Sequence, residues 1–91
     1  MTYLLCRNRV SDFSEWKAVF DAHSQGHRDA GLQLVNVWRS IQEPNNVFFA
    51  FKVANMDRAH AFIGDPSAAR AGADAGVFDG EYHFVESIPG Y

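Results

Sequence analysis

The sequence has a single cysteine, no excess of positive charge and no long apolar run, and each shortage excludes a class of protein. Cys6 alone cannot form an internal disulfide or a thiolate metal cluster. The formal net charge of -3 provides no basic field for a nucleic acid backbone. No apolar stretch reaches the length of about 18 residues that a membrane span needs, and no charged start followed by an apolar run indicates a signal peptide. We therefore expect a soluble, cytoplasmic protein that binds neither nucleic acid nor membrane.

The usual cofactor and nucleophile motifs are absent too. The chain contains no glycine-rich phosphate loop, no haem or flavin fingerprint, and no order of Ser, His and Asp that indicates a catalytic triad. We expect no organic cofactor. Internal repeats, low-complexity stretches and linkers are also missing, so residues 1–91 are expected to form one domain.

Apolar and aromatic side chains are abundant instead. Hydrophobic residues make up 47% of the chain and aromatic residues 14%, with eight Phe and two Trp. A domain of this size buries only about two-thirds of its unfolded surface. So many apolar groups on so small a domain predict an apolar face that a partner covers.

Strand-like and helix-like segments alternate along the chain. Asp12 followed by Glu15 is typical of a helix start, Gly31 is typical of a helix end, and Asp65-Pro66 indicates a fresh start inside the second helix. The predicted strands cover residues 2–10, 32–42, 47–53 and 80–88, and the predicted helices cover about 12–30 and 55–76.

This order predicts an α+β fold of the ferredoxin-like βαββαβ type, a four-stranded antiparallel sheet with two helices on one face. Residues 47–53 carry apolar side chains on both parities, and only one set can face the helices. A second copy is the simplest cover for the other set, so we expect a homodimer through the sheet face, a dimeric α/β barrel.

Three segments carry a resemblance to a known superfamily: Tyr3–Arg7 leading into Asp12–Trp16, the stretch His23–Gly31, and the closing Gly80–Phe84. With the element order, they resemble the dimeric α/β-barrel superfamily, and within it small uncharacterised bacterial relatives of antibiotic-biosynthesis-type monooxygenases and muconolactone-isomerase-like proteins. The resemblance implies two ferredoxin-like protomers packed sheet against sheet, with a ligand between the sheet and the helices of each. No motif here identifies one reaction, so no family's catalytic residues carry over.

One helix stripe ends in two histidines. Its members are spaced 3-4-3-4 and share one side of a helix: Phe13, Trp16, Phe20, His23 and His27. Imidazoles on an aromatic stripe predict a pocket that holds a polar group, and an imidazole titrates near neutral pH. We predict His23, the deeper of the two by this spacing, as the acid or base, with His27 and Tyr82 orienting the ligand.

The walls of the pocket follow from the aromatic content. Trp16, Phe20 and Trp38 are predicted as ligand-binding walls, with polar help from Asn36 and His83. The alternative is that these aromatics only pack in the core and the dimer seam.

The predicted function is that of a small-molecule enzyme or binder, resembling a cofactor-free monooxygenase, isomerase or cyclase, for a small apolar, aromatic or polyketide-like ligand. Two alternatives stay open. One is a non-catalytic ligand-sensing or assembly module. The other is a metal site through His23 and His27, whose i, i+4 spacing lets two imidazoles share one ion. Ser24 stands where a zinc protease would carry Glu after the first His, which excludes that class.

Overall fold

Four strands and four short helices make up the computed structural model, which describes all residues from Met1 to Tyr91. The strands are β1 (Thr2–Val10), β2 (Leu32–Arg39), β3 (Asn46–Val53) and β4 (Val77–Glu86). The helices are α1 (Phe13–Ala22), α2 (Ser24–Asp29), α3 (Met56–Gly64) and α4 (Pro66–Asp74). None of them combines the length and the apolar composition that crossing a membrane would require.

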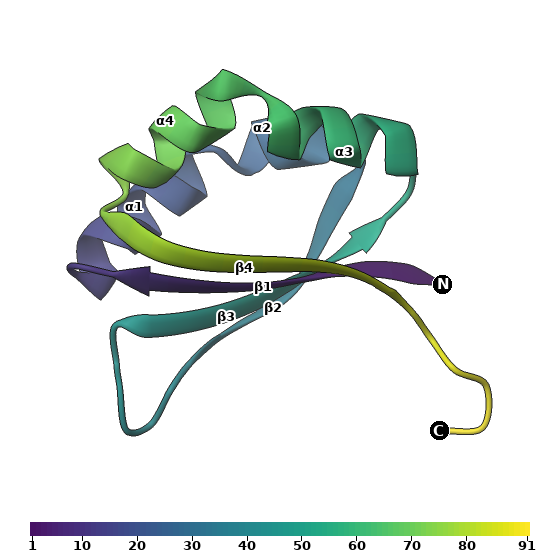
Figure 1. Cartoon of the computed structure of the whole chain (residues 1–91), viewed down its shortest axis with the longest axis horizontal. Helices are drawn as coiled ribbons and strands as arrows, with labels where there is room; N and C mark the ends of the chain where they lie inside the picture. The colour runs from purple at the N-terminus through teal and green to yellow at the C-terminus, as the bar shows by residue number, and fades with distance from the viewer.

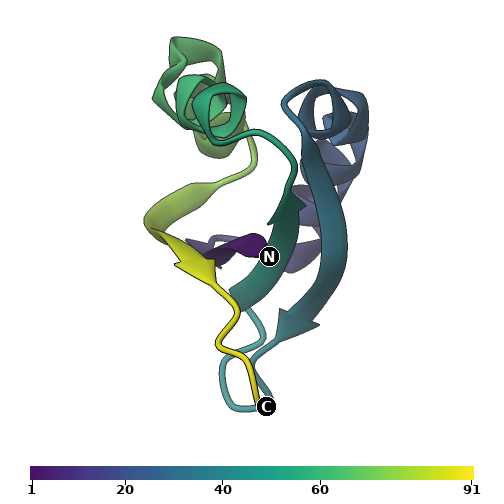
Figure 2. The same ribbon diagram turned by 90° about the vertical axis from the view of Figure 1, so that its right-hand side faces the viewer.

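The strands form one antiparallel sheet in the order β2-β3-β1-β4, and all four helices cover the same face of it (Figure 1). Seen end on, the pair α1 and α2 lies beside the pair α3 and α4 on this face of the sheet (Figure 2). The ferredoxin-like α+β prediction is confirmed, with each predicted helix divided in two.

The division between α3 and α4 is the one that the sequence predicts. The Asp65 side chain accepts a hydrogen bond from the Ser67 backbone N–H at 2.8 Å, and Pro66 occupies the first helical position. Proline has no N–H for the preceding turn, so the first helix ends at Gly64 and a second begins.

The division between α1 and α2 corrects the prediction of a single helix up to residue 30. His23 has φ -97° and ψ 10°, so the backbone leaves the helix there and resumes it at Ser24. Its ring Nδ1 lies 2.8 Å from the Val19 carbonyl oxygen, which also accepts from the His23 backbone N–H at 3.2 Å. The His23 side chain and its own backbone N–H thus share the Val19 carbonyl oxygen, which weakens the helical hydrogen bonding at this point. The side chains after residue 23 therefore do not continue the direction predicted for one unbroken helix.

A bulge in β2 corrects a second prediction. Leu34 pairs with Phe51 and Asn36 with Ala50, so Val35 is an extra residue between two consecutive partners on β3. An extra residue reverses the side-chain alternation. Leu32 and Leu34 therefore face the helices, whereas Asn36 and Trp38 face the opposite side of the sheet.

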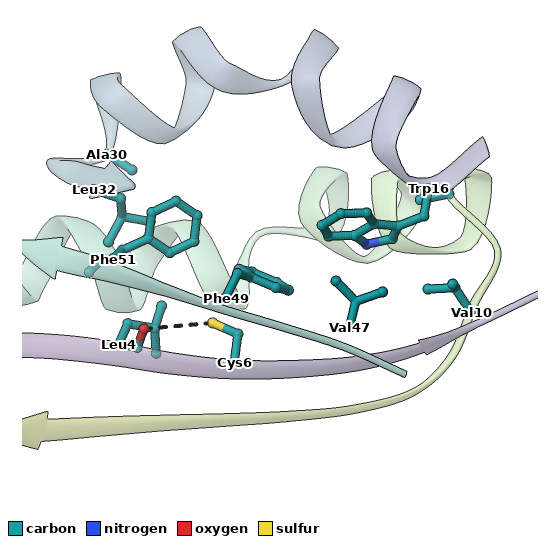
Figure 3. Packing of buried hydrophobic residues seen from close by; sticks show 11 residues of the cluster. Leu4, Cys6, Val10, Trp16, Ala30, Leu32, Val47, Phe49 and Phe51 are labelled. Atoms are coloured by element: carbon teal, nitrogen blue, oxygen red, sulfur yellow. Dashed lines mark hydrogen bonds between the residues drawn. The ribbon is translucent and has the colours of Figure 1, made fainter. Parts of the chain in front are cut away.

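The core lies between the sheet and the helices, as Figure 3 shows. Trp16 is only 2% exposed and lies over Phe49, with their ring centroids 5.6 Å apart. Burying a side chain such as Phe49 contributes about 1.5–3 kcal/mol. The core therefore fixes α1 on the sheet and fixes the inner wall of the site.

The opposite face of the sheet has no cover. Leu5, Phe48 and Trp38 are 46%, 39% and 48% exposed on it. The β2–β3 turn and the segment after β4 both project beyond the sheet on the side away from the helices (Figures 1 and 2). Each carries an exposed apolar residue, Ile41 in the turn and Ile88 after β4. We call this surface the open face.

Candidate functional site

A cavity of about 360 Å³ lies between the two helix pairs and the sheet. The pair α1 and α2 makes little contact with the pair α3 and α4, which leaves room between them. Fifteen of the 20 lining residues are hydrophobic. Its size and apolar lining are those of a small-molecule site.

His27 is the polar group at the centre of the aromatic cluster in this cavity. Its ring centroid lies 4.9 Å from that of Phe20, 5.1 Å from Phe51 and 5.6 Å from Phe62. Neither ring nitrogen has a hydrogen-bond partner in the protein. Burial, with smaller contributions from the neighbouring His23 and Arg28, lowers the pKa of His27 to about 4. At neutral pH the ring is therefore uncharged, with one N–H donor and one free acceptor nitrogen.

His23 lies at the edge of the same cavity and is exposed to solvent. A carbonyl oxygen can only accept, so the bond to Val19 requires a proton on Nδ1 when the ring is neutral, which leaves Nε2 as an acceptor. The prediction that His23 is the deeper of the two histidines is wrong. The turn at residue 23 moves this ring outward, and His27 takes the inner position.

Asn8 is a cavity residue that the sequence reasoning missed. It is buried beside the indole N–H of Trp16 and the hydroxyl of Tyr82. Because an indole N–H only donates, the Asn8 carbonyl oxygen must face it, at 3.2 Å, and the Asn8 amide nitrogen then lies 3.0 Å from the Tyr82 oxygen and 3.0 Å from the Arg7 carbonyl. Asn8 lies on the same side of β1 as Leu4 and Cys6. A polar residue among apolar ones on that side of the strand was the feature of the sequence that could have revealed it.

This orientation makes the Tyr82 oxygen an acceptor toward Asn8, so the Tyr82 O–H proton is free to donate elsewhere. Burial of the hydroxyl end raises the pKa of Tyr82, and the bond to Asn8 only partly offsets this. Tyr82 therefore stays a neutral phenol. The cavity lining thus includes an unpartnered imidazole from α2 and a hydroxyl donor from β4.

The predicted residues separate into two groups. Trp16, Phe20, His23, His27 and Tyr82 all line the cavity. Three others lie outside it, on the open face, and the prediction that they share the site is corrected: Asn36, Trp38 and His83. The β2 bulge turns the first two away. His83 pairs with Leu5 and alternates with Tyr82, so both cannot face the helices.

These side chains support neither a reactive cysteine nor a metal site. Cys6 is buried in the cavity wall, and burial raises the pKa of its thiol to about 12, so it stays a thiol and packs as a small hydrophobe. No three His, Cys, Asp or Glu side chains come close enough together to hold a metal ion. His23 and His27 thus have no third protein ligand.

Comparison with known proteins was made at the level of sequence and of structure. No protein-family model and no curated protein matches the sequence. Solved structures do match over nearly the full length. A proposed antibiotic biosynthesis monooxygenase from Bordetella bronchiseptica superposes with a TM-score of 0.76 at 14% identity, covering 96% of each chain. One from Deinococcus radiodurans gives 0.71 at 14% identity, covering 100% of this chain and 96% of the other.

A third similar structure is an uncharacterised NIPSNAP domain protein from Burkholderia xenovorans, with a TM-score of 0.69 at 14% identity over 98% and 96% of the two chains. At such low identity the likeness shows the fold. The neighbours expected from the sequence resemblance are confirmed, and the chain has the ferredoxin-like fold of antibiotic biosynthesis monooxygenase-like proteins.

Proposed function

We propose that the protein binds a small aromatic or polyketide-like molecule with a hydroxyl, enol or keto group, and acts on it by acid–base chemistry without an organic cofactor. The observation that carries this proposal is His27, an imidazole enclosed by three phenylalanine rings without any hydrogen bond to the protein. No buried side-chain nitrogen or oxygen lacks a hydrogen-bond partner, so the His27 ring nitrogens, which have no partner in the protein, are open to solvent. A ligand hydroxyl would take the place of water at these nitrogens and make the hydrogen bond inside an apolar space.

The cavity suits a neutral ligand. His27 is uncharged near pH 7, Tyr82 is a phenol, and Asn8 holds its position through Trp16 and the Arg7 carbonyl. None of these groups brings a charge into the apolar space. A planar ring would stack among the phenylalanines, accept or donate one hydrogen bond at His27 and accept another from the Tyr82 O–H.

Proton transfer would follow from the same two contacts. His27 takes a proton from an enol oxygen or from carbon beside a ketone, and the electron pair moves onto the substrate as an enolate. The Tyr82 O–H donates to the enolate oxygen, and return of the proton at a different atom completes an isomerisation. The same enolate is the electron-rich species that a cofactor-free monooxygenase would present to O₂. The neighbours described as monooxygenases support this wider class.

Binding of 2-naphthol, measured by isothermal titration calorimetry, tests the proposal. His27→Phe keeps the aromatic packing and removes both ring nitrogens, while Tyr82→Phe removes only the hydroxyl. One lost hydrogen bond of about 1 kcal/mol lowers affinity roughly fivefold, and we expect each variant to weaken binding by about five- to tenfold.

His60→Phe is the matched control, because His60 is exposed on α3 and does not line the cavity. It should leave the dissociation constant unchanged. If 2-naphthol fails to bind, or if His27→Phe binds it as tightly as the wild type, the proposed site is wrong. Binding without turnover of any enol or ketone would reduce the proposal to a ligand-binding module.

We also propose a homodimer through the open face. Exposed Leu5, Phe48 and Trp38 give this face an apolar centre, and Arg7 at one end is already paired with Asp79 at 3.0 Å and Glu81 at 2.7 Å. A second copy could cover the apolar centre without burying an unpaired Arg7 charge. The projecting turn and terminal segment would then reach around the partner.

A further inference from the structure

The cavity adjoins a second hollow, a more open groove of about 330 Å³ between α4 and β4. Five residues line both spaces: Ala68, Ala69, Gly72, Val77 and Tyr82. On the α4 side the boundary consists of two alanines and a glycine. No large side chain of that helix therefore closes the cavity toward the groove.

Gly72 lies at this boundary and has no packing reason to be glycine. A Cβ added there would meet no atom within 4 Å, and the residue lies within the regular helix α4. Glycine inside a helix costs about 1 kcal/mol relative to alanine. The glycine thus leaves open space where the two hollows join.

Most residues that line the groove are hydrophobic, and one of them is an exposed aromatic ring. Phe78 is 71% exposed beside Val77 and Ala73. The only charged residue of the lining is Asp79, whose carboxylate is paired with Arg7 at 3.0 Å. The groove therefore offers apolar surface and no free charge.

We propose that cavity and groove form one site with two compartments, and that the ligand is elongated. Its hydroxylated ring lies against His27 in the cavity, and an apolar tail passes Gly72 and Tyr82 into the groove under Phe78. This inference rests on the proposed function, because the ring must occupy the cavity for the tail to reach the groove. It assigns the ligand to alkyl-substituted phenols or enols rather than compact single rings.

A series of 4-alkylphenols from ethyl to hexyl, titrated by calorimetry, tests the second compartment. Each methylene that leaves water adds about three- to fourfold in affinity, so four methylenes should add about 80- to 250-fold in the wild type. Gly72→Leu should fill the junction and abolish this gain. Phe78→Ser, a surface change that leaves the core intact, should reduce the gain several-fold while 4-ethylphenol binds as before.

Arg70→Leu is the matched control for Gly72→Leu, since Arg70 is exposed on the same helix and lines neither space. It should keep the full chain-length gain. Short phenols that bind without any gain from longer chains would overturn the second compartment alone, and so would a gain that persists unchanged in both Gly72→Leu and Phe78→Ser. Failure of every phenol to bind would instead contradict the proposed function on which the two-compartment site rests.

Discussion

At the scale of single residues, the site depends on how unlike its two histidines are. Four positions separate them, yet His23 is exposed and bonded to Val19, whereas His27 is enclosed by rings and unbonded. Burial lowers the pKa of the half-buried His27 ring to about 4. The proposed chemistry therefore centres on His27, with Tyr82 and Asn8 in the lining of the same cavity.

The pKa of His27 makes a prediction about stability and pH. The folded-state pKa of about 4 lies below the ordinary value of 6.5, so the unfolded chain binds more protons between these values. The stabilisation from a neutral His27 is complete above pH 6.5, falls as the pH drops toward 4, and changes no further below that. Solvent screening reduces this effect, because the ring is partly exposed. We expect the free energy of unfolding to fall by about 2 kcal/mol, which lowers the Tm by about 10 °C.

Thermal unfolding of the wild type and His27→Phe, followed by circular dichroism from pH 7.5 to 3.5 at one protein concentration, measures this loss. Carboxylates also titrate in this range, but they do so in both proteins. The wild-type Tm should fall more steeply than that of the variant between pH 6.5 and 4. Parallel curves would show that His27 is not held neutral in the folded protein.

At the scale of elements, α4 is only weakly held over the cavity. It contains no buried residue and faces the cavity with small side chains such as Ala68 and Ala71. Its start depends on Asp65 and Pro66. Elements with little buried apolar surface open at low free energy.

Asp65→Ala should therefore destabilise α4 locally. Loss of an N-cap costs about 1 kcal/mol, which lowers the Tm of a domain this small by roughly 4–8 °C. Hydrogen exchange followed by NMR should show protection lost first in α4 and retained in β1. Asp57→Ala is the control, because Asp57 lies in the first turn of α3 but is not its cap, and its effect should be much smaller. Equal loss of protection across the sheet and α4 would argue against an independently opening helix.

The elements also show where sequence reasoning succeeds. Starts and stops that depend on local chemistry were predictable: Asp12 accepts from the Glu15 backbone N–H, Gly31 adopts a φ of 75°, and Asp65 restarts a helix. The two misplacements come from one-residue irregularities, the turn at His23 and the bulge at Val35. The bulge reverses the direction in which the following side chains point, and the turn rotates it.

Such irregularities depend on tertiary contacts that no local pattern contains. The turn at residue 23 brings His27 against Phe51 and Phe62, which come from later parts of the chain. The bulge leaves Leu34 on the helical side of the sheet while Trp38 reaches the open face. The fold and half of the site were therefore predictable, but the depth of each histidine was not.

At the scale of the whole molecule, one face of the sheet is covered by helices, and the other has an apolar centre and no cover. We expect a dimer of twice 10.2 kDa in sedimentation at micromolar concentration. Phe48→Lys places a charge at the centre of the open face and should weaken association by at least tenfold.

The control is Met56→Lys, because Met56 is 37% exposed, close to the 39% of Phe48, but lies at the start of α3 on the helical side. It should leave the dimer intact. A wild-type monomer at micromolar concentration would refute the dimer and leave the cavity of each protomer unaffected.

The central claim is that His27 is a neutral, unpartnered group to which a ligand in the cavity binds. Long-range ¹H–¹⁵N NMR of the histidine rings observes this directly, at pH 7 and during titration with 2-naphthol. We predict the nitrogen shifts of a neutral imidazole for His27, and a change at its acceptor nitrogen that saturates with the ligand while His60 stays constant. A charged His27 at pH 7, or a His27 signal that naphthol leaves unchanged while it binds elsewhere, would contradict the account.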